Sequence, residues 1–392
     1  MKIAIATPVL FDKASPFNHL FKAILGGFLD AGNEIVRYVA CRDEREDGYK
    51  YGYDENSQKI QYIKFDRKES DHGNIISRYI RDTLTNIKEA NAIKRSDADV
   101  LFEDVSYSSF WSVKAAKKKG MRVVAMLQDV WPDNAVQSGL ISQSGLLYRY
   151  FEAWQRYVYR KADKLICISD DMKEFIVSKG VPAEKITVIY NWGYSDEVVN
   201  IPWEENKFVK KYELNKQIFY AVYAGNIGKM QNVELVVDAA KELQNDDTIR
   251  FLIIGDGARR EEIKKRAEGV RNIQLLPLQP SEIAIHIYSA AGVNIIPLVE
   301  GGPKTAMPSK TGVVLSCGKP VIFAFGKECE FARIVHKYNA GSCVSASNAS
   351  ELARAVKECS ENKSENGTQQ LFADMFTKTD GVERYVNEIS AH

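Results

Sequence analysis

A glycine-rich segment, Ala221-Val-Tyr-Ala-Gly225-Asn226-Ile-Gly228-Lys229, comes directly after a short run of β-branched and aromatic residues and before an amphipathic stretch. A glycine turn between a strand and a helix lets backbone N–H groups approach a phosphate closely. The same spacing also suits a tight turn that needs glycine only for its backbone angles. Spacing alone leaves both interpretations open.

A second glycine-rich turn, Ile254-Gly255-Asp256-Gly257, ends the next predicted strand. Like the first turn, it lies at the end of a predicted strand and is compatible with phosphate binding. Asp256 is suited either to ligand contact or to capping a helix that begins at Arg259, and we favour the cap.

The third segment, residues 300–311 (EGGPKTAMPSKT), lies between a predicted strand and a predicted helix. Pro308 suits the first position of a helix, which would place Ser309, Lys310 and Thr311 at the helix start. The helix macrodipole disfavours a lysine there unless an anion is bound. The sequence therefore indicates an anion site, with a solvent-facing lysine as the alternative.

The elements that must position these residues alternate between short β-branched runs and longer amphipathic stretches, which is typical of βαβ units and parallel sheets. Thirteen strands are predicted near 2–7, 34–40, 60–65, 100–105, 122–128, 164–169, 186–190, 219–224, 249–254, 273–276, 293–297, 320–325 and 342–345. Helices are predicted near 17–31, 74–95, 109–119, 144–161, 170–179, 231–244, 259–268, 281–290, 309–317, 328–338 and 348–361, followed by a helical tail.

Length and composition support two α/β domains. A chain of 392 residues is more than twice the size of a typical single domain of about 150. We expect an N-terminal domain over 1–199, a polar linker over 200–217, a C-terminal domain over 218–375 and a helix over 376–392 able to pack back on the N-terminal domain. In doubly wound sheets ligands bind at the carboxyl ends of the strands, so the cleft between the domains is the expected site.

Charge and cysteine content exclude several classes of protein. The formal net charge is +1, with 45% hydrophobic and 27% charged residues, which excludes a disordered chain and a histone-like polycation. The six cysteines are irregularly spaced without a CxxC pair, so we expect free thiols and neither a disulfide framework nor a zinc site. No run of 18 apolar residues occurs, and the N-terminus is too short in apolar residues for a signal peptide.

Residues 105–164 form a basic, aromatic region inside this nearly neutral chain. They contain ten Lys or Arg against four Asp or Glu, a local net charge of +6, and include the run YRYFEAWQRYVYRK at 148–161. A helix of this composition suits an anionic lipid interface. A core helix whose aromatic residues pack inward is the alternative. No nucleic-acid-binding motif accompanies the patch, so we expect no nucleic-acid partner.

Taken together, these segments resemble glycosyltransferase family 4 of the GT-B fold. The resemblance rests on YAGNIGKMQNVELVVDAAKEL, FLIIGDG and MPSKTGVVLSCGKPVI in the second half and on RKADKLICISDDMKEFIVSKGVPAEKITVIYNW in the first. The run DVWPDN at 129–134, the Asn191-Trp192 pair and the Pro-Ser-Lys form resemble the bacterial branch that includes N-acetylfucosaminyl transferases of O-antigen and capsule assembly. The match is good over about 120–325 and holds only in outline elsewhere.

The resemblance implies two doubly wound, Rossmann-like domains and a retaining transfer from a nucleotide sugar, usually a UDP sugar, to an acceptor held by the first domain. The family's diphosphate-binding glycine turn and helix-start donors map, with the nearby Gly255, to the residues Gly225, Asn226, Gly228, Gly255, Ser309 and Lys310. No metal or other cofactor is expected.

Some positions depart from the family pattern. The carboxylates that contact the donor sugar and the ribose map to Thr305 and Val313, leaving Glu300, beside Gly301 and Gly302, as a displaced candidate for the sugar. The usual Arg and Lys on the diphosphate map to Asn226 and Gln231. Positive charge must then come from Lys229, Lys304 and Lys310.

On the acceptor side, Gln128 stands where family members frequently carry a histidine, and Asp129 follows it. Asp129 is the candidate for gripping or deprotonating the acceptor hydroxyl, with a turn-capping role as the alternative. The other acceptor-side candidates are Trp131, Ser15, Asn18 and His19, although a surface-loop histidine is the commoner role for the last.

For the mechanism, no carboxylate pair is placed for a covalent intermediate, so we predict same-face transfer in which Lys310 and backbone N–H groups stabilise the departing diphosphate. The single Asp-x-Asp, Asp97-Ala-Asp99, precedes a strand and is interpreted as a solvated turn, because a metal-diphosphate site belongs at a strand's carboxyl end.

The resulting hypothesis is a cytoplasmic enzyme, peripheral at the inner face of the cell membrane, that glycosylates a polyprenyl-diphosphate-linked saccharide in O-antigen, capsule or exopolysaccharide assembly. The alternatives are a sugar-nucleotide epimerase and a non-catalytic scaffold or binding subunit of the same fold.

Overall fold

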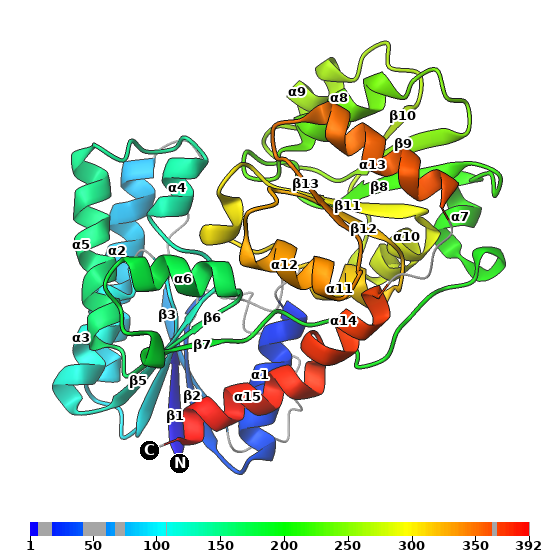
Figure 1. Cartoon of the computed structure of the whole chain (residues 1–392). Helices are drawn as coiled ribbons and strands as arrows, with labels where there is room; N and C mark the ends of the chain where they lie inside the picture. The colour runs from blue at the N-terminus through cyan, green and yellow to red at the C-terminus, as the bar shows by residue number, and fades with distance from the viewer. Residues whose placement is uncertain (7–17, 42–59, 67–74, 107, 363–366, 392) are drawn as a thin grey trace. The chain divides into compact units, whose positions relative to one another are not determined.

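The computed structural model describes residues 1–6, 18–41, 60–66, 75–106, 108–362 and 367–391 (Figure 1). The chain forms two compact units. Unit 1 comprises Met1–Ile168, Met172–Ile189 and Gly381–His392, and unit 2 comprises Ser169–Asp171 and Tyr190–Asp380.

Unit 1 is built on a seven-stranded parallel sheet of order β3-β2-β1-β4-β5-β6-β7. Its strands are β1 (Lys2–Ala6), β2 (Glu34–Cys41), β3 (Ile60–Asp66), β4 (Val100–Asp104), β5 (Arg122–Leu127), β6 (Lys164–Cys167) and β7 (Ile186–Val188). The central strands are almost continuously apolar because both of their faces are covered, as parallel sheets require. In the register, Ile3 of β1 lies opposite Ile35 of β2 and Val100 of β4.

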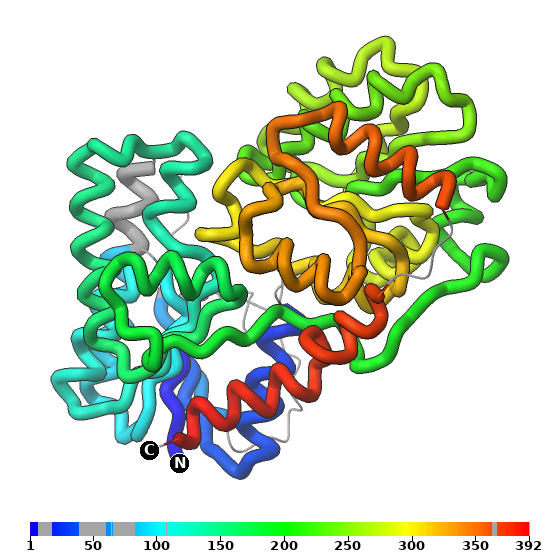
Figure 2. Tube along the Cα trace, viewed as in Figure 1, coloured from blue at the N-terminus to red at the C-terminus, as the bar shows by residue number. Residues whose placement is uncertain are grey.

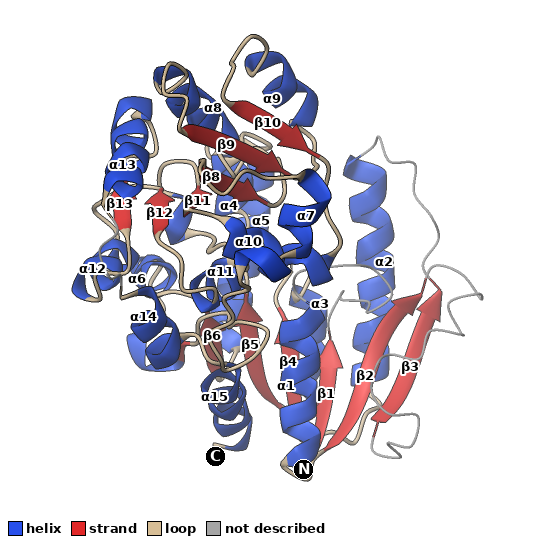
Figure 3. Cartoon of the chain, turned by 90° about the vertical axis from the view of Figure 1, so that its right-hand side faces the viewer, coloured by secondary structure: helices blue, strands red, loops and turns tan. Residues whose placement is uncertain are grey.

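Helices cover both faces of this sheet. They are α1 (Asn18–Asp30), α2 (Ile75–Ile93), α3 (Phe110–Lys119), α4 (Asp133–Gln137), α5 (Leu146–Lys161) and α6 (Asp170–Ser178). Helices α2, α3 and α5 lie on one side, and α1 and the C-terminal helix α15 (Lys378–Ser390) lie on the other (Figures 1 and 3).

The C-terminal residues of α15 belong to unit 1. The ring of Tyr385 packs edge-on against Phe102 of β4, and the Arg122 guanidinium donates hydrogen bonds to the backbone carbonyls of Glu388 and Ile389. Val382 also packs against Gly27 of α1. Both chain ends therefore lie at the same end of unit 1 (Figure 2).

Unit 2 contains a six-stranded parallel sheet of order β10-β9-β8-β11-β12-β13. Its strands are β8 (Phe219–Ala224), β9 (Ile249–Ile254), β10 (Ile273–Leu276), β11 (Val293–Pro297), β12 (Val321–Ala324) and β13 (Ser342–Val344). This is the doubly wound order, in which the chain reverses direction across the sheet between β8 and β11.

The helices of unit 2 are α7 (Lys207–Tyr212), α8 (Val233–Glu242), α9 (Arg260–Arg266), α10 (Ala284–Ala290), α11 (Thr311–Ser316), α12 (Glu330–Lys337), α13 (Ala349–Glu361) and α14 (Thr368–Met375). Helices α8, α9 and α13 cover one face of the sheet and α10, α11 and α12 the other (Figure 1). A core of Val236, Ile263 and Leu352 against Phe251 and Ile295 fills the first of these layers.

The predicted α/β class and all thirteen predicted strands are confirmed, with ends within about two residues. The short helices α4 and α7 were not predicted. The segment expected to be a linker contains α7, because Asn206 caps this helix by accepting hydrogen bonds from the N–H groups of Phe208 and Val209, both of which are buried. The contact division also falls at Ile189, ahead of the boundary expected at 199.

Two expectations about chemistry can be checked against the described residues. Cys167, Cys317, Cys329, Cys343 and Cys359 are all free thiols. Among the helices of the described segments, none combines the length and the apolar character needed to cross a membrane.

Candidate functional site

The reversal of strand order between β8 and β11 places two loops at the carboxyl edge of the unit 2 sheet. The glycine turn 225–229 follows β8, and the loop 298–310 follows β11. Because connections leave these neighbouring strands toward opposite faces, a crevice forms between the loops, and open α/β sheets bind ligands there. The backbone N–H of Val299 donates to the carbonyl of Met230, which ties the two loops together.

Close packing of backbone requires glycine at the second predicted turn. Gly255 has φ +157°, and a Cβ there would lie 1.9 Å from the carbonyl oxygen of Gly225. A Cβ on Gly257 would lie 2.5 Å from the carbonyl of Ile227. The second turn therefore packs directly against the backbone of the first turn, and a larger residue at Gly255 or Gly257 would displace the first turn.

The predicted cap by Asp256 is wrong. Helix α9 begins at Arg260, and no side chain caps its N-terminus. The Asp256 carboxylate instead accepts a hydrogen bond of 2.8 Å from the N–H of Gly257, while its carbonyl accepts from the N–H of Ile227. Asp256 thus stabilises the contact between the two turns.

The first turn keeps donors available for a ligand. Within the described part of the chain, the backbone N–H groups of Asn226 and Gly228 donate no hydrogen bond. The Asn226 side chain donates to Gln231 at 3.1 Å, so the two amides that replace the family's basic residues bind each other. Gly225, Asn226 and Gly228 are all partly or fully exposed, and a phosphate can reach them.

Lys310 reaches across from the second loop to the end of β8. Its Nζ donates a hydrogen bond of 2.8 Å to the carbonyl of Ala224 and lies 4.0 Å from the centroid of the Tyr223 ring. A Cβ on Gly225 would lie 3.2 Å from this Nζ, so glycine at 225 also makes room for the lysine. The predicted meeting of Lys310 and the glycine turn is present in the structure.

The described residues provide no counter-charge for Lys310. Among the described residues no carboxylate lies within ion-pair distance of its Nζ. Desolvation by the surrounding protein lowers the pKa of Lys310 to about 7. The side chain still retains some exposure to solvent, so a bound anion would supply the missing partner.

The prediction that Pro308 opens the following helix is wrong. Helix α11 begins at Thr311, and the Pro308 carbonyl accepts hydrogen bonds from both the N–H and the hydroxyl of Thr311. This turn places Ser309 and Lys310 before the helix. Glycine at position 312 lets helix α11 pack closely on the backbone near Asn191, because a Cβ at Gly312 would lie 2.6 Å from the Asn191 carbonyl oxygen.

The donor-sugar candidates have different environments. Thr305 is fully buried, and its hydroxyl donates to the carbonyl of Gly302 at 3.3 Å. Gly302 packs against Leu298: a Cβ added at Gly302 would lie 2.9 Å from the Leu298 Cβ. Gly301 takes the left-handed conformation, with φ +71°. Glu300 is exposed on the same loop, as are Lys304 here and Lys229 on the glycine turn.

The acceptor-side candidates belong to unit 1. Gln128 and Asp129 follow β5 at its carboxyl end, as predicted. Desolvation raises the pKa of Asp129 to about 6, and a hydrogen bond from the Asn134 side chain opposes this shift. Trp131 packs edge-on against Phe151 with centroids 5.4 Å apart.

Of the three remaining acceptor-side residues, the structure describes two. Asn18 and His19 form the start of α1. Ser15 lies outside the described residues.

A buried ionic cluster beside Asp129 was not predicted. Lys179 lies 2.7 Å from Asp133 and 3.2 Å from Glu152, and the Tyr148 hydroxyl donates to Asp133 at 2.9 Å. These residues come from α4, α5 and the end of α6, far apart in sequence. Because Asp133 lies only four residues after Asp129, the cluster also holds the segment that carries Asp129 in place.

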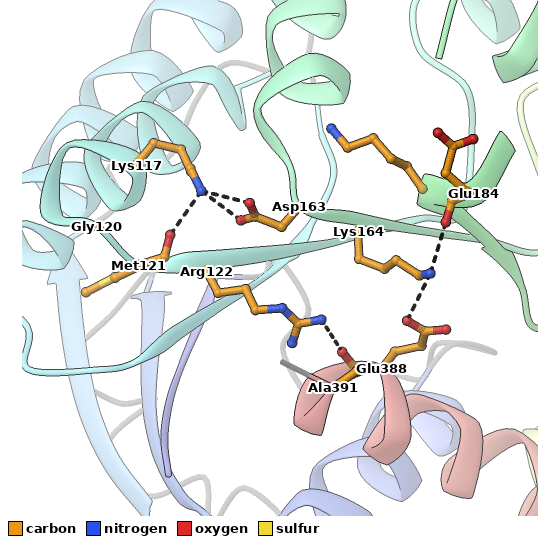
Figure 4. Close-up of a pocket in the computed structure, with 10 residues that line it drawn as sticks. Lys117, Gly120, Met121, Arg122, Asp163, Lys164, Glu184, Glu388 and Ala391 are labelled. Carbon is orange, nitrogen blue, oxygen red and sulfur yellow. Dashed lines mark hydrogen bonds and ion pairs between the residues drawn. The ribbon is translucent and has the colours of Figure 1, made fainter. Parts of the chain in front are cut away.

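A hollow of about 620 Å³ lies at the amino ends of β5 and β6, on the edge opposite to Asp129 (Figure 4). Several of its cationic side chains have partners within the protein: Lys117 pairs with Asp163, Lys164 lies 3.7 Å from Glu388, and Arg122 donates to backbone carbonyls. At the amino end of β4, the exposed Asp97 pairs with Lys2, and Asp99 accepts the backbone N–H of Lys2. Asp97 and Asp99 therefore make local contacts at the amino end of β4. No cluster of metal ligands occurs among the described residues.

Two family models match the chain, one in each half. The model described as Glycosyltransferase Family 4 matches residues 36–192, and the model described as Glycosyl transferases group 1 matches residues 204–370.

Curated relatives agree with these matches. WbjE of Pseudomonas aeruginosa, named as a glycosyltransferase, is 28% identical over 62% of this chain, and the match spans 60% of the length of WbjE. WcaI of Escherichia coli, named as a colanic acid biosynthesis glycosyl transferase, is 24% identical over 70% of this chain and 69% of its own.

Solved structures share the whole fold. HepE of Anabaena, solved in complex with UDP, matches with a TM-score of 0.73 at 14% identity over 100% of both chains. WaaG, a glycosyltransferase involved in lipopolysaccharide biosynthesis, matches with a TM-score of 0.69 at 15% identity over 100% of both chains. The predicted pair of Rossmann-like domains of the GT-B type is confirmed.

Proposed function

Since this chain belongs to the glycosyltransferases whose family models match its two halves, we propose that it transfers a sugar from a UDP-linked donor to a lipid-linked saccharide in bacterial surface-polysaccharide assembly. The transfer is retaining and independent of metal. The donor is bound by unit 2 and the acceptor by unit 1. Relatives named for colanic acid or lipopolysaccharide biosynthesis support the polysaccharide assignment, and HepE with UDP supports the nucleotide.

The observation that carries this proposal is Lys310 at the strand reversal. Its ammonium has no carboxylate partner among the described residues and lies beside a turn whose backbone N–H groups are available. Two negative charges of a diphosphate would satisfy both features at once. A structural lysine is normally paired or solvated and gains nothing from such a position.

In the proposed reaction, the bond between the anomeric carbon and the diphosphate oxygen breaks while the acceptor oxygen bonds to the same face of the sugar. The departing diphosphate takes the acceptor proton. Lys310 and the N–H groups of Asn226 and Gly228 stabilise the charge that develops on the leaving oxygen, which is the main source of acceleration.

Asp129 grips the acceptor hydroxyl from unit 1. With a pKa of about 6, its carboxylate is mostly ionised at neutral pH and basic enough to accept a hydrogen bond from a reacting hydroxyl. The ionic cluster at Asp133 keeps this segment in place.

A lipid-linked acceptor requires contact with a membrane, and unit 1 offers a suitable surface at the start of α5. Leu140, Leu146 and Leu147 are 58%, 81% and 61% exposed, and Arg149 is exposed between them and the rest of the basic helix. Apolar side chains flanked by cations suit an anionic lipid surface. Among the aromatic residues of α5, Phe151 and Tyr159 are buried and Trp154 stacks on Phe110, whereas Tyr150 is 42% exposed. The leucines, with Tyr150, therefore carry the apolar contact.

The experiment combines donor binding and transfer. UDP-sugars, and their GDP, ADP and TDP counterparts, are screened by thermal shift with and without EDTA, because a ligand that binds the folded state raises the melting temperature. The donor found is then used with a polyprenyl-diphosphate-linked saccharide, and the product is examined for retained anomeric configuration.

The matched variants are Lys310→Ala and Lys265→Ala, the latter an exposed lysine of α9 in the same unit. We expect a metal-independent shift with a UDP-sugar that Lys310→Ala loses and Lys265→Ala keeps, and transfer reduced about 100-fold or more in the first variant only. Release of free UDP without an acceptor would indicate an epimerase, and binding without turnover a scaffold. Absence of any nucleotide binding would overturn the proposal.

A further inference from the structure

Tyr223 contacts both parts of the candidate diphosphate site. It is the penultimate residue of β8 and is completely buried. Its ring lies 4.0 Å from the Lys310 Nζ, and its hydroxyl donates a hydrogen bond of 2.5 Å to the carbonyl of Asn226. One rigid side chain thus joins the lysine from the loop after β11 to the turn after β8.

The ring favours the charged form of the lysine. The face of an aromatic ring is negative, so an ammonium above it is attracted more strongly where water is scarce. This attraction opposes the desolvation that lowers the pKa of Lys310. The other titratable side chain at this point is Tyr288, whose hydroxyl lies 3.5 Å from the same Ala224 carbonyl that Lys310 binds and whose pKa is raised by burial.

The hydroxyl fixes the turn itself. By donating to the Asn226 carbonyl, Tyr223 holds the peptide that joins Asn226 to Ile227 in one orientation. The N–H groups on either side of that peptide, those of Asn226 and Gly228, are the ones available for a ligand. The orientation of the carbonyl and the direction of these donors change together, because they share one short turn.

We propose that Tyr223 is the positioning residue of the diphosphate site: its ring holds the Lys310 ammonium, and its hydroxyl orients the donors of the glycine turn. This inference rests on the proposed function and deepens it. The ligand class is a nucleoside diphosphate, and Tyr223 acts on it only through Lys310 and the turn.

The test separates the two contacts with UDP as the probe, measured by calorimetry between pH 6.5 and 9 on the full chain. Tyr223→Phe removes the hydroxyl and keeps the ring, and Tyr223→Leu removes both. Tyr220→Phe is the matched control, since Tyr220 is a buried tyrosine on the same strand whose hydroxyl accepts the N–H of Asn215.

For Tyr223→Phe we expect UDP affinity to fall about threefold to tenfold, with the pH at which affinity declines unchanged. For Tyr223→Leu we expect a larger loss and a decline that begins at lower pH, because the ammonium loses the ring that favours it. Tyr220→Phe should bind UDP as the wild type does. If Tyr223→Leu does not fold, Tyr223→Phe against Tyr220→Phe still decides the hydroxyl's role.

The outcomes distinguish this inference from the proposed function. If the wild type binds UDP and the Tyr223 variants match it in affinity and pH profile, the positioning role is overturned while the proposed function stands. Equal losses in Tyr223→Phe and Tyr220→Phe would mean a general effect on strand β8 and would also overturn it. If the wild type binds no nucleoside diphosphate, both the positioning role of Tyr223 and the proposed function are overturned.

Discussion

Two half-buried lysines, one in each unit, have opposite electrostatic environments. Lys179 of unit 1 lies against Asp133 and Glu152, and its side chain is 9% exposed. Burial alone would lower the pKa of Lys179, but the hydrogen bond and charge of Asp133, with the charge of Glu152, raise it. The Lys310 Nζ of unit 2 contacts the Ala224 carbonyl and the Tyr223 ring and has no carboxylate partner among the described residues, and desolvation lowers the pKa of Lys310 to about 7.

On the proposed function, this difference separates a lysine that stabilises the fold from one that binds a ligand. A buried charge is tolerated when it is paired. An unpaired buried charge destabilises the fold, and such groups are found most often at functional sites. Lys179 completes its cluster inside the protein. We propose that the counter-charge of Lys310 comes from the bound diphosphate, so the two lysines should respond oppositely to mutation.

The largest expected effect is on folding. Lys179→Met leaves Asp133 and Glu152 as two partly buried carboxylates without their shared cation, and should lower the free energy of unfolding by about 3–5 kcal/mol. Lys310→Met removes an unpaired cation and should leave the melting temperature unchanged or raise it. Urea unfolding of both variants measures this.

The pH dependence of the first effect has a definite sign. Because the folded state raises the pKa of Lys179 above 10.5, the stabilisation is fully present below that pH and is lost as pH rises through the folded pKa. Equal destabilisation by the two variants at pH 7 would abolish the contrast between the lysines.

A second effect, on both units, concerns glycines with positive φ. Gly225→Ala brings a Cβ to 3.2 Å from the Lys310 Nζ at φ +153°, so UDP affinity should fall about tenfold or more, with strain of about 1–3 kcal/mol. Gly120→Ala in unit 1 has φ +85° with open space around it and should cost about 1 kcal/mol through strain alone.

Calorimetry with UDP and urea unfolding of each glycine variant separate these two costs. If Gly225→Ala kept wild-type affinity, Lys310 and the turn would not share one ligand.

The third effect is proton uptake on donor binding. Desolvation lowers the pKa of Lys310 to about 7, so part of the lysine is neutral above pH 7, and a bound diphosphate restores its charge. UDP binding above pH 7 should therefore be accompanied by proton uptake that increases with pH. Above pH 7 the affinity should fall as pH rises, by up to about tenfold per unit.

Calorimetry in buffers of different ionisation enthalpy measures this uptake, and Lys310→Met should abolish it. Lys179, already charged through its carboxylate partners, should contribute nothing. Uptake that persists in Lys310→Met would assign the proton to another group.

Sequence patterns predicted the sheets well because buried parallel strands are continuous apolar runs, as in Val123–Leu127 and Val321–Ala324. Helix α7 was missed because its lysines mask the two buried residues Phe208 and Val209. The helix start at Pro308 was misplaced because a hydroxyl, that of Thr311, stabilises a turn there.

For the site, motif residues were easier to predict than their supports. Gly225 and Lys310 carry local signals, in a strand-to-helix turn and a charged loop. Tyr223 has the pattern of an ordinary core residue of a strand, and its role depends on a lysine 87 positions away. The Lys179 and Asp133 pair likewise joins residues that no spacing rule connects.

The smallest expected effect is the loss of a neutral member of the paired cluster. Tyr148→Phe removes the hydroxyl that donates to Asp133 at 2.9 Å, but Lys179 still neutralises that carboxylate. The free energy of unfolding should fall by only about 1 kcal/mol. Tyr157→Phe on the same helix is the control, since its hydroxyl makes no hydrogen bond among the described residues. A loss as large as that of Lys179→Met would mean that hydrogen bonding to Asp133, rather than charge pairing, stabilises the cluster, and the contrast with Lys310 would then lie in hydrogen-bond partners instead of counter-charge.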